Sequence, residues 1–155
     1  MTITLNGSDL TVTQVVAVAR HGEAVVLAPA AIAAMRQARV VVDEVLGTGE
    51  PVYGLTTGVG ERKAHVLEQA ERQRFNQRLV LNHRIAQGDA APADVVRGAM
   101  VCLANSYAKG VTGVRPELCQ TPPACTATIG RYHAPMQEQS RVVIGESFVP
   151  FVTPA

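Results

Sequence analysis

The chain has 155 residues, of which 47% are hydrophobic and 17% are charged. This composition supplies enough apolar material for a folded core and excludes an intrinsically disordered chain. The formal net charge of +1 gives no electrostatic reason to expect nucleic acid or an anionic membrane as a partner. No stretch stays apolar over the roughly 18 residues of a membrane span, and the N-terminus has no signal-peptide pattern. We therefore expect a cytoplasmic protein without nucleic acid or membrane among its partners.

The cysteines favour a reduced compartment. There are three, Cys102, Cys119 and Cys125, and an odd number without a secretory signal favours free thiols over a disulfide framework. Cys119 and Cys125 lie near His133 in the sequence, but their spacing matches no zinc pattern. No metal is expected.

Short strands and a short helix are expected at the start of the chain. Residues 2–5 and 24–27 have the alternating or compact apolar pattern of short strands. Between them, Thr11 or Thr13 is placed to cap a short helix that runs through Arg20. The sequence therefore predicts a strand, a helix and a second strand in this order.

Three longer helices are expected over residues 30–46, 65–84 and 92–109. Pro29 suits the first position of the first helix, because the missing N–H of proline costs nothing there. Glycines concentrated between the first two helices predict a loop over residues 55–63. The apolar residues expected on the inner side of the second helix are Leu67, Ala70, Phe75, Leu79 and Val80.

The end of the chain differs in character from the rest. The last forty residues contain six of the nine prolines, and only residues 141–144 and 148–152 have the pattern of strands. We therefore expect a mainly α domain with minor β over residues 1–118. The proline-rich segment 119–155 is expected to pack on the same domain.

The most informative stretch for function is Val-Tyr-Gly-Leu-Thr-Thr-Gly-Val-Gly at residues 52–60. Such a glycine-rich loop lets the backbone approach a ligand closely while it holds a phenol at a defined turn. Tyr53 is therefore a candidate general acid or base. The alternative is an ordinary turn with a packed tyrosine.

Other polar groups stand at the ends of apolar helices. Asn82 and His83 close the second long helix and Asn105 lies near the end of the third, while Arg115 follows a glycine turn. An arginine can bind a carboxylate through two hydrogen bonds. The alternatives are a histidine that only complements the helix dipole and an arginine that is only a solvated surface charge.

Three motifs in order resemble one family. Residues 53–60 read Tyr-Gly-Leu-Thr-Thr-Gly-Val-Gly, residues 78–83 read Arg-Leu-Val-Leu-Asn-His, and residues 105–115 read Asn-Ser-Tyr-Ala-Lys-Gly-Val-Thr-Gly-Val-Arg. They are similar to Tyr-Gly-(Ile/Val)-Asn-Thr-Gly-Phe-Gly, Asn-Leu-Val-Leu-Ser-His and Asn-Ser-Leu-Ala-Arg-Gly-Tyr-Ser-Gly-(Val/Ile)-Arg. These are motifs of the N-terminal part of the histidine ammonia-lyase family, the aromatic amino acid lyases and aminomutases. The resemblance covers about residues 1–118 and implies the helical N-terminal domain of those enzymes.

The resemblance also implies roles for individual residues. Tyr53 matches the base that takes the β-proton of the substrate, and His83 matches a residue that lines the substrate pocket. Asn105 and Arg115 match the polar part of the active site. The catalytic candidates are therefore Tyr53 and Arg115. The candidates for substrate binding are Gly60, Asn82, His83 and Asn105.

The sequence departs from the family pattern at the prosthetic group. The family makes a methylidene-imidazolone from an Ala-Ser-Gly tripeptide, which does not occur among these 155 residues. Within the tyrosine motif, Thr56 replaces the usual Asn and Val59 the usual Phe. These departures count against ammonia elimination by this chain alone, and no cofactor is expected.

The leading hypothesis is an enzyme that works without that cofactor. Tyr53 would serve as its acid or base in a proton transfer, isomerisation or cyclisation of a small, largely apolar substrate in natural-product biosynthesis. One alternative is a subunit of a split ammonia-lyase completed by a partner chain. Others are a non-catalytic module that binds a ligand or partner, and an inactive fragment. A homo-oligomer, most simply a dimer, is expected in each case because two long helices need a cover for their apolar faces.

Overall fold

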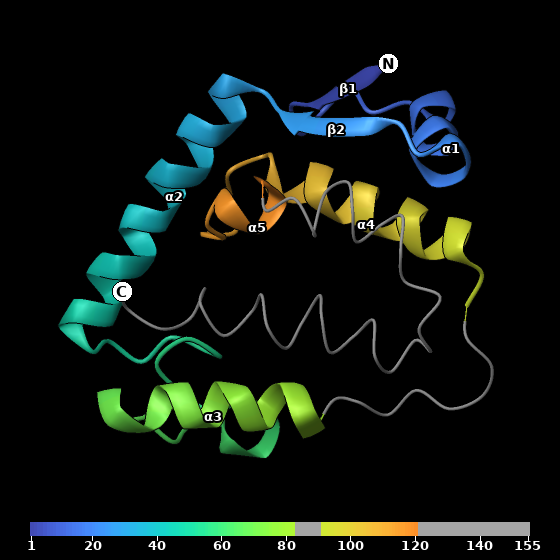
Figure 1. Ribbon diagram of the computed structural model, residues 1–155. Coiled ribbons are helices and arrows are strands. Elements are labelled where there is room, and N and C mark those ends of the chain that lie inside the picture. Colours follow the sequence, from blue (N-terminus) through green and yellow to red (C-terminus); the bar gives the residue numbers. More distant parts are fainter. Residues whose placement is uncertain (83–90, 121–155) are drawn as a thin grey trace. The chain divides into compact units, whose positions relative to one another are not determined.

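The computed structural model describes residues 1–82 and 91–120 (Figure 1). Its described part is mostly helical with one two-stranded sheet, which confirms the predicted fold class. The described residues fall into two compact units. The first consists of residues 1–40 and 91–120, and the second of residues 41–82.

The first unit begins with the predicted strand, helix and strand. Strand β1 (Thr2–Leu5) and strand β2 (Ala24–Leu27) pair in parallel, and helix α1 (Val12–His21) makes the crossover between them. Residues on one face of a strand recur at every second position. The buried residues follow this rule in register, with Ile3 opposite Val25 and Leu5 opposite Leu27.

Helix α1 has a cap at each end. The N–H of Gln14 donates to the hydroxyl of Thr11 (3.3 Å), and the Gln14 side chain accepts from the N–H of Thr11 (2.9 Å). This reciprocal arrangement satisfies two donors that the first turn of a helix leaves free. Gly22 ends the helix with φ 68°, and its N–H donates back to Val18. Of the two predicted caps, Thr11 is confirmed and Thr13 is not.

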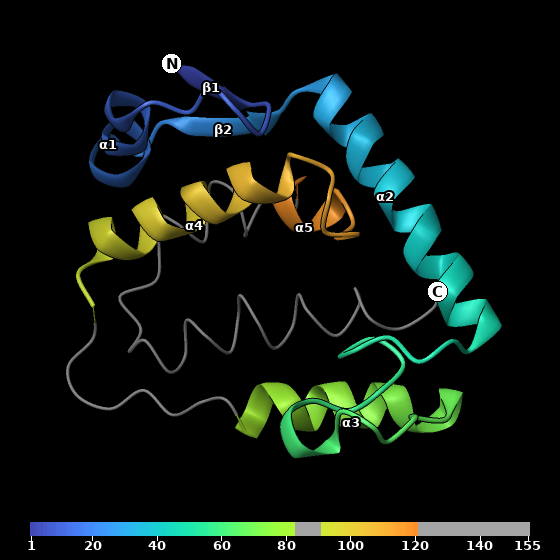
Figure 2. The same cartoon turned by 180° about the vertical axis from the view of Figure 1, so that it is seen from behind.

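The core of the first unit forms where the sheet meets α1 and three further helices. These are the first half of α2 (Pro29–Thr48), α4 (Ala93–Tyr107) and the short α5 (Glu117–Gln120), which the sequence did not predict. Figure 2 shows α4 and α5 on the same side of the two strands. The buried apolar residues that form one cluster are Ile3, Leu5, Val18, Val25, Leu27, Ala31, Met35, Val101, Ala108 and Cys119.

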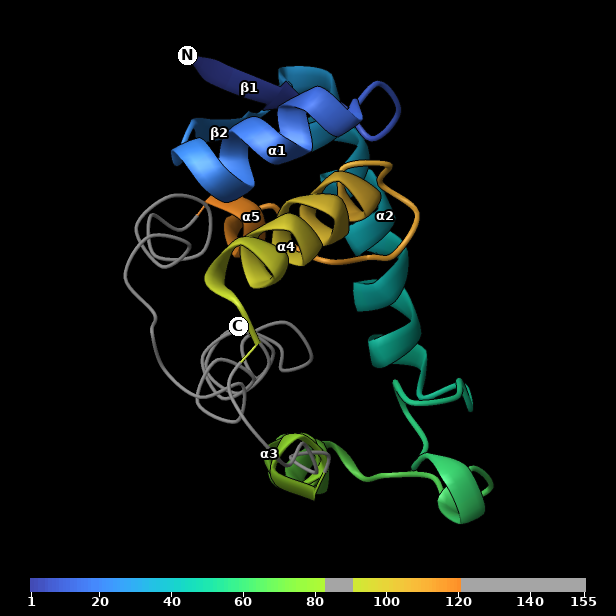
Figure 3. The same ribbon diagram turned by 90° about the vertical axis from the view of Figure 1, so that its right-hand side faces the viewer.

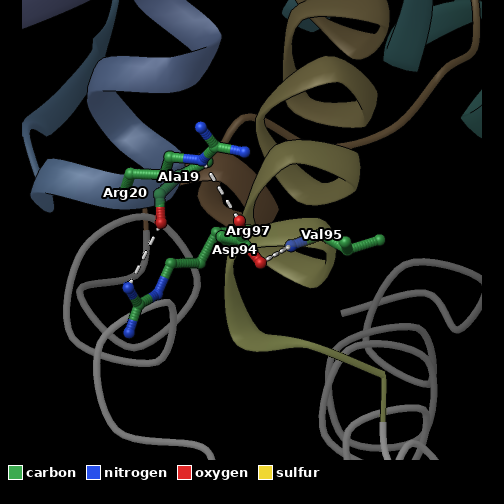
Figure 4. Close-up of polar contacts among 5 residues, drawn as sticks. All are labelled: Ala19, Arg20, Asp94, Val95 and Arg97. Carbon is green, nitrogen blue, oxygen red and sulfur yellow. Dashed lines mark hydrogen bonds and ion pairs between the residues drawn. The ribbon is translucent and has the colours of Figure 1, made fainter.

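Helices α1 and α4 lie against each other (Figure 3) and share two polar contacts. Arg20 pairs with Asp94 at 3.2 Å, and Arg97 donates to the carbonyl of Ala19 at 3.3 Å (Figure 4). The Arg20 and Asp94 side chains are 66% and 39% exposed, and an ion pair so open to solvent contributes little stability. The apolar core, rather than this ion pair, therefore holds the two helices together.

The second unit contains the end of α2, a long loop with the single turn η1 (Gly60–Arg62), and helix α3 (Gln69–Asn82). Helix α2 continues two residues beyond the predicted end, to Thr48. The predicted start of α3 at residue 65 is wrong, because Val66 forms a β-bridge with Thr57 instead. This pairing between distant residues holds residues 65–68 outside the helix.

The buried face of α3 is polar. Arg72 and Asn76 are buried, whereas Phe75 and Leu79 are half-buried. Ala70 was predicted to be inside and is exposed, so that prediction is wrong. The prediction for Leu67 is confirmed, although Leu67 precedes the helix. The structure does not describe the side chain of Val80, so the prediction for this residue is not tested.

Some predictions fall on residues that the structure does not describe. They are the strands at 141–144 and 148–152, most of the segment 119–155, and the helix end at Arg84. No helix within residues 1–82 and 91–120 is long and apolar enough to cross a bilayer. The same described residues contain no group of three or more His, Cys, Asp or Glu side chains suited to a metal ion.

Candidate active site

The loop between α2 and α3 (residues 49–68), which contains Tyr53 and is called the tyrosine loop below, is organised around one carbonyl group. The carbonyl oxygen of Val52 accepts from the N–H groups of Leu55 (3.1 Å), Thr56 (3.0 Å) and Thr57 (3.2 Å). Gly54 has φ 70°, a conformation that favours glycine. The chain therefore turns tightly around Val52, and Tyr53 occupies this turn.

Thr56 fixes the inside of the loop. It is fully buried, and its hydroxyl donates to the carbonyl of Glu50 and accepts from the N–H of Val52 at 2.7 Å. The carbonyl of Thr56 accepts from the N–H of Leu67 at 2.8 Å. A buried hydroxyl must be paired to avoid a desolvation cost, and here one side chain joins both sides of the turn.

Tyr53 points its phenol outward from this scaffold. Tyr53 is 65% exposed, and its phenol oxygen accepts a hydrogen bond from the N–H of Gly60 at 3.3 Å. Gly60 has φ 60° and open space where a Cβ would stand. The glycine therefore contributes a backbone conformation and an N–H donor rather than a close packing contact.

Gly58 is required for a different reason. A Cβ on this residue would lie 2.7 Å from the Cβ and the carbonyl oxygen of Arg62, closer than van der Waals packing allows. Its N–H donates to His65 at 2.9 Å. The backbone of the loop thus folds back on itself with room for hydrogen alone at position 58.

Two candidates stand at the end of α3. Asn82 is the last residue of the helix, and its side chain is not described. His83 lies outside the described residues. Their assignment to substrate binding therefore remains a prediction.

The other two candidates belong to the first unit. Asn105 lies in α4, and its side-chain oxygen accepts a hydrogen bond from the N–H of Gly7 at 3.0 Å. Arg115 is half-buried, directly ahead of α5, and has an interaction partner. Asn105 thus takes part in holding the fold, and its role towards a substrate stays a prediction.

One ionisable side chain near Asn105 is perturbed. Burial raises the pKa of Tyr107 above its ordinary value of 10.0, and the nearby Cys119 adds to the rise. Both effects disfavour a phenolate. Tyr107 therefore suits the core rather than proton transfer at neutral pH.

Of the six predicted site residues, the structure brings Tyr53 and Gly60 together within the second unit. Asn105 and Arg115 lie in the first unit. Sequence reasoning did not single out Arg72, which is buried on α3 and bonded to both ends of the tyrosine loop. An arginine among other polar residues on a helix gives no sequence signal that it will be buried or bonded to distant carbonyl groups.

Comparison with known proteins defines the class. The family model described as aromatic amino acid lyase matches residues 10–127. This chain belongs to the aromatic amino acid lyase family. It is 38% identical over 120 residues to histidine ammonia-lyase from Streptomyces griseus and 35% identical over 116 residues to that from Treponema denticola. These matches cover 77% and 75% of this chain, and 23% of each relative.

Solved structures agree. The chain is similar to the ergothioneine-degrading enzyme ergothionase from Treponema denticola, with a TM-score of 0.74 and 27% identity over 77% of this chain and 24% of that one. It also shares its fold with a tyrosine aminomutase from Streptomyces globisporus, with a TM-score of 0.72 and 23% identity over 94% of this chain and 24% of that one. The chain thus spans about a quarter of the length of the relatives it matches.

Proposed function

We propose that this chain provides the proton-transferring tyrosine of a lyase-type site, with Tyr53 as acid or base towards a small substrate. The supporting observation is the hydrogen bond from the N–H of Gly60 to the Tyr53 oxygen, on a loop that leaves the phenol accessible. A donor aimed at an oxygen stabilises the negative charge that develops there when the proton leaves. Accessibility lets the same oxygen reach a substrate.

The exposure of Tyr53 favours a site that is completed by further polypeptide. A general base works best where water is excluded and the substrate is held in place. Tyr53 is 65% exposed and has neither condition by itself. The first candidate function is therefore ammonia elimination from an aromatic amino acid by this chain together with a partner lyase subunit. In that reaction Tyr53 accepts the β-proton, and the C–H electrons form a double bond as the amine departs.

The prosthetic group of the family does not fit the residues present. It is made from Ala-Ser-Gly, and these 155 residues contain no such tripeptide. No step is therefore assigned to that group on this chain. This observation favours the second candidate function, a cofactor-independent proton transfer, isomerisation or cyclisation of a small apolar substrate in biosynthesis, with Arg115 as the second catalytic residue.

An assay in two arms separates the candidates. The chain is tested alone and together with a separately expressed lyase segment that contains Ala-Ser-Gly, each with L-histidine, L-tyrosine and L-phenylalanine. The first candidate requires release of ammonia only in the mixture. The expected effect of Tyr53→Phe is a loss of turnover of roughly 10²- to 10⁴-fold, the usual contribution of a general acid or base.

The matched control is Tyr107→Phe, which removes a phenol oxygen from the first unit. It is expected to keep turnover close to that of the parent. Equal turnover of Tyr53→Phe and the parent would exclude Tyr53 as the proton carrier. Turnover by the chain alone that is lost in Arg115→Ala would favour the second candidate.

The proposed assembly also has a physical reason in α4. Val95 and Leu103 on this helix are 59% and 43% exposed, and covering apolar surface is favourable. A second copy or the partner subunit would supply that cover. Light scattering at tens of micromolar concentration tests this, and a monomer in both arms would count against it.

A further inference from the structure

Arg72 is a buried cation that bridges two backbone carbonyl groups. Its side chain is on α3, and the residue is 7% exposed. Its Nε donates to the carbonyl of Leu67 at 3.1 Å, and its Nη1 donates to the carbonyl of Leu46 at 3.2 Å. All three residues belong to the second unit.

The two carbonyl groups stand at the two ends of the tyrosine loop. Leu46 lies in the last turn of α2, where carbonyl groups have no partner within the helix. Leu67 lies just ahead of α3. A positive charge at the C-terminal end of a helix is favourable, so Arg72 satisfies the end of α2 and closes the loop with one rigid group.

Hydrogen bonds lead from Arg72 to the tyrosine. Arg72 holds the carbonyl of Leu67, and the N–H of Leu67 donates to Thr56 at 2.8 Å. The Thr56 hydroxyl in turn accepts from the N–H of Val52, the residue that precedes Tyr53. Each contact fixes the next, and the path ends at the turn that presents the phenol.

We propose that Arg72 is a positioning residue that closes the loop between α2 and α3 and thereby sets the place of Tyr53. Its planar guanidinium presents Nε and Nη1 to two carbonyl groups in fixed directions, a rigid fork that the compact ammonium on the flexible stem of lysine does not reproduce. The positioning role rests on the proposed function of Tyr53. The closing of the loop by Arg72 is tested separately, without any assay of turnover.

The test uses the full chain with its three tyrosines replaced by 3-fluorotyrosine, the Tyr53 resonance being assigned from Tyr53→Phe. Arg72→Met is compared with Arg74→Met, which removes the same charge from an exposed position of the same helix. In Arg72→Met the amides of Leu67 and Gly58 are expected to exchange roughly tenfold to hundredfold faster, which corresponds to the loss of hydrogen bonds from a charged donor. The Tyr53 fluorine resonance is expected to shift or broaden.

Amides of the first unit, such as that of Val101, are expected to keep their exchange rates in both variants, and Arg74→Met is expected to match the parent throughout. Unchanged exchange at Leu67 and Gly58 in Arg72→Met would overturn the closure. Arg72→Lys keeps the positive charge and is expected to disturb folding less than Arg72→Met does. Its exchange rates are expected to fall between those of the parent and Arg72→Met, and rates equal to the parent would overturn the requirement for two carbonyl contacts.

Turnover in the two-chain assay separates this proposal from the function on which it rests. If Arg72 positions Tyr53, Arg72→Met lowers kcat while the KM for the amino acid stays the same, and Arg72→Lys restores part of kcat. Faster amide exchange in Arg72→Met, together with a turnover of Tyr53→Phe equal to that of the parent, would support the closing of the loop by Arg72 and reject the proposed function of Tyr53. Loss of turnover in Tyr53→Phe, with an unchanged Tyr53 resonance in Arg72→Met, would support that function and overturn the positioning role.

Discussion

The N–H of Gly7 donates to the side-chain oxygen of Asn105 at 3.0 Å, across 98 residues of sequence. Gly7 belongs to the turn that follows β1, and Asn105 lies near the end of α4. The contact joins the beginning of the first unit to α4. A residue first considered for substrate binding thus has an observed structural partner.

Asn105→Ala is expected to lower the free energy of unfolding by about 1–3 kcal/mol, because it leaves a partly buried N–H without an acceptor. Urea unfolding measures the change. The control is Ser106→Ala at the next position, since the exposed Ser106 hydroxyl donates within its own helix, to the carbonyl of Cys102. This control is expected to change stability by less than about 0.5 kcal/mol. Equal effects of the two variants would contradict the role assigned to Asn105.

Gly7 and Gly22 both have a positive φ but differ in the space available for a side chain, so they can be compared as a matched pair. Their φ angles are 90° and 68°, but a Cβ on Gly7 would lie 2.7 Å from the backbone nitrogen of Lys109, whereas Gly22 has open space. Gly22→Ala is expected to cost about 1–2 kcal/mol, the penalty for a left-handed residue with a side chain. Gly7→Ala is expected to cost more, because the turn must also move away from Lys109. Urea unfolding of both variants checks the order, and an equal cost would show that the close approach is relieved without strain.

Thr56→Val keeps the shape of the side chain and removes its hydroxyl. The carbonyl of Glu50 and the N–H of Val52 then lose a part-buried partner, at a total cost of about 1–3 kcal/mol. Amide exchange at Val52 is expected to accelerate in Thr56→Val and to stay near the parent rate in Thr56→Ser, which retains a hydroxyl. Similar rates in the valine variant and the parent would rule out the hydroxyl as the internal tie of the loop.

Tyr107 makes the stability of the first unit depend on pH in the alkaline range. Its pKa is raised above 10.0 in the folded chain by burial and by Cys119, so the neutral phenol is favoured by folding. The associated stability is fully present below about pH 10, the ordinary pKa of tyrosine. It is lost as the pH rises through the folded pKa.

Denaturant unfolding between pH 8 and 11 tests this dependence. Tyr107→Phe is expected to lose less stability above about pH 10 than the parent does, because it has no phenol to ionise. Cys119→Ala is expected to reduce the alkaline loss in part, since it removes the smaller of the two causes. The same alkaline loss in Tyr107→Phe and the parent would show that the phenol is not responsible.

The elements predicted best are those whose signals are local. The capping box at Thr11 and the alternating apolar residues of β1 and β2 lie within a few residues of the structure they specify. The glycines around Tyr53 likewise predicted a loop, because residues with positive φ are strongly restricted to glycine.

The features that the sequence did not predict depend on distant contacts. Helix α3 starts four residues late because Thr57 pairs with Val66 and the Thr56 carbonyl binds Leu67. The burial of Arg72 has no apolar periodicity behind it and depends on carbonyl groups at both ends of a loop. The contact between Gly7 and Asn105 is equally invisible to a reading of neighbouring residues.

The exposed phenol of Tyr53 has a practical consequence for any study of this chain. The sequence contains no tryptophan and three tyrosines, so its ultraviolet emission comes from tyrosine alone. Since Tyr53 is 65% exposed, anything that settles over the loop removes water from one of only three fluorophores. The chain thus contains an intrinsic optical probe at the position proposed for chemistry, and a partner that contains tryptophan would quench it by energy transfer.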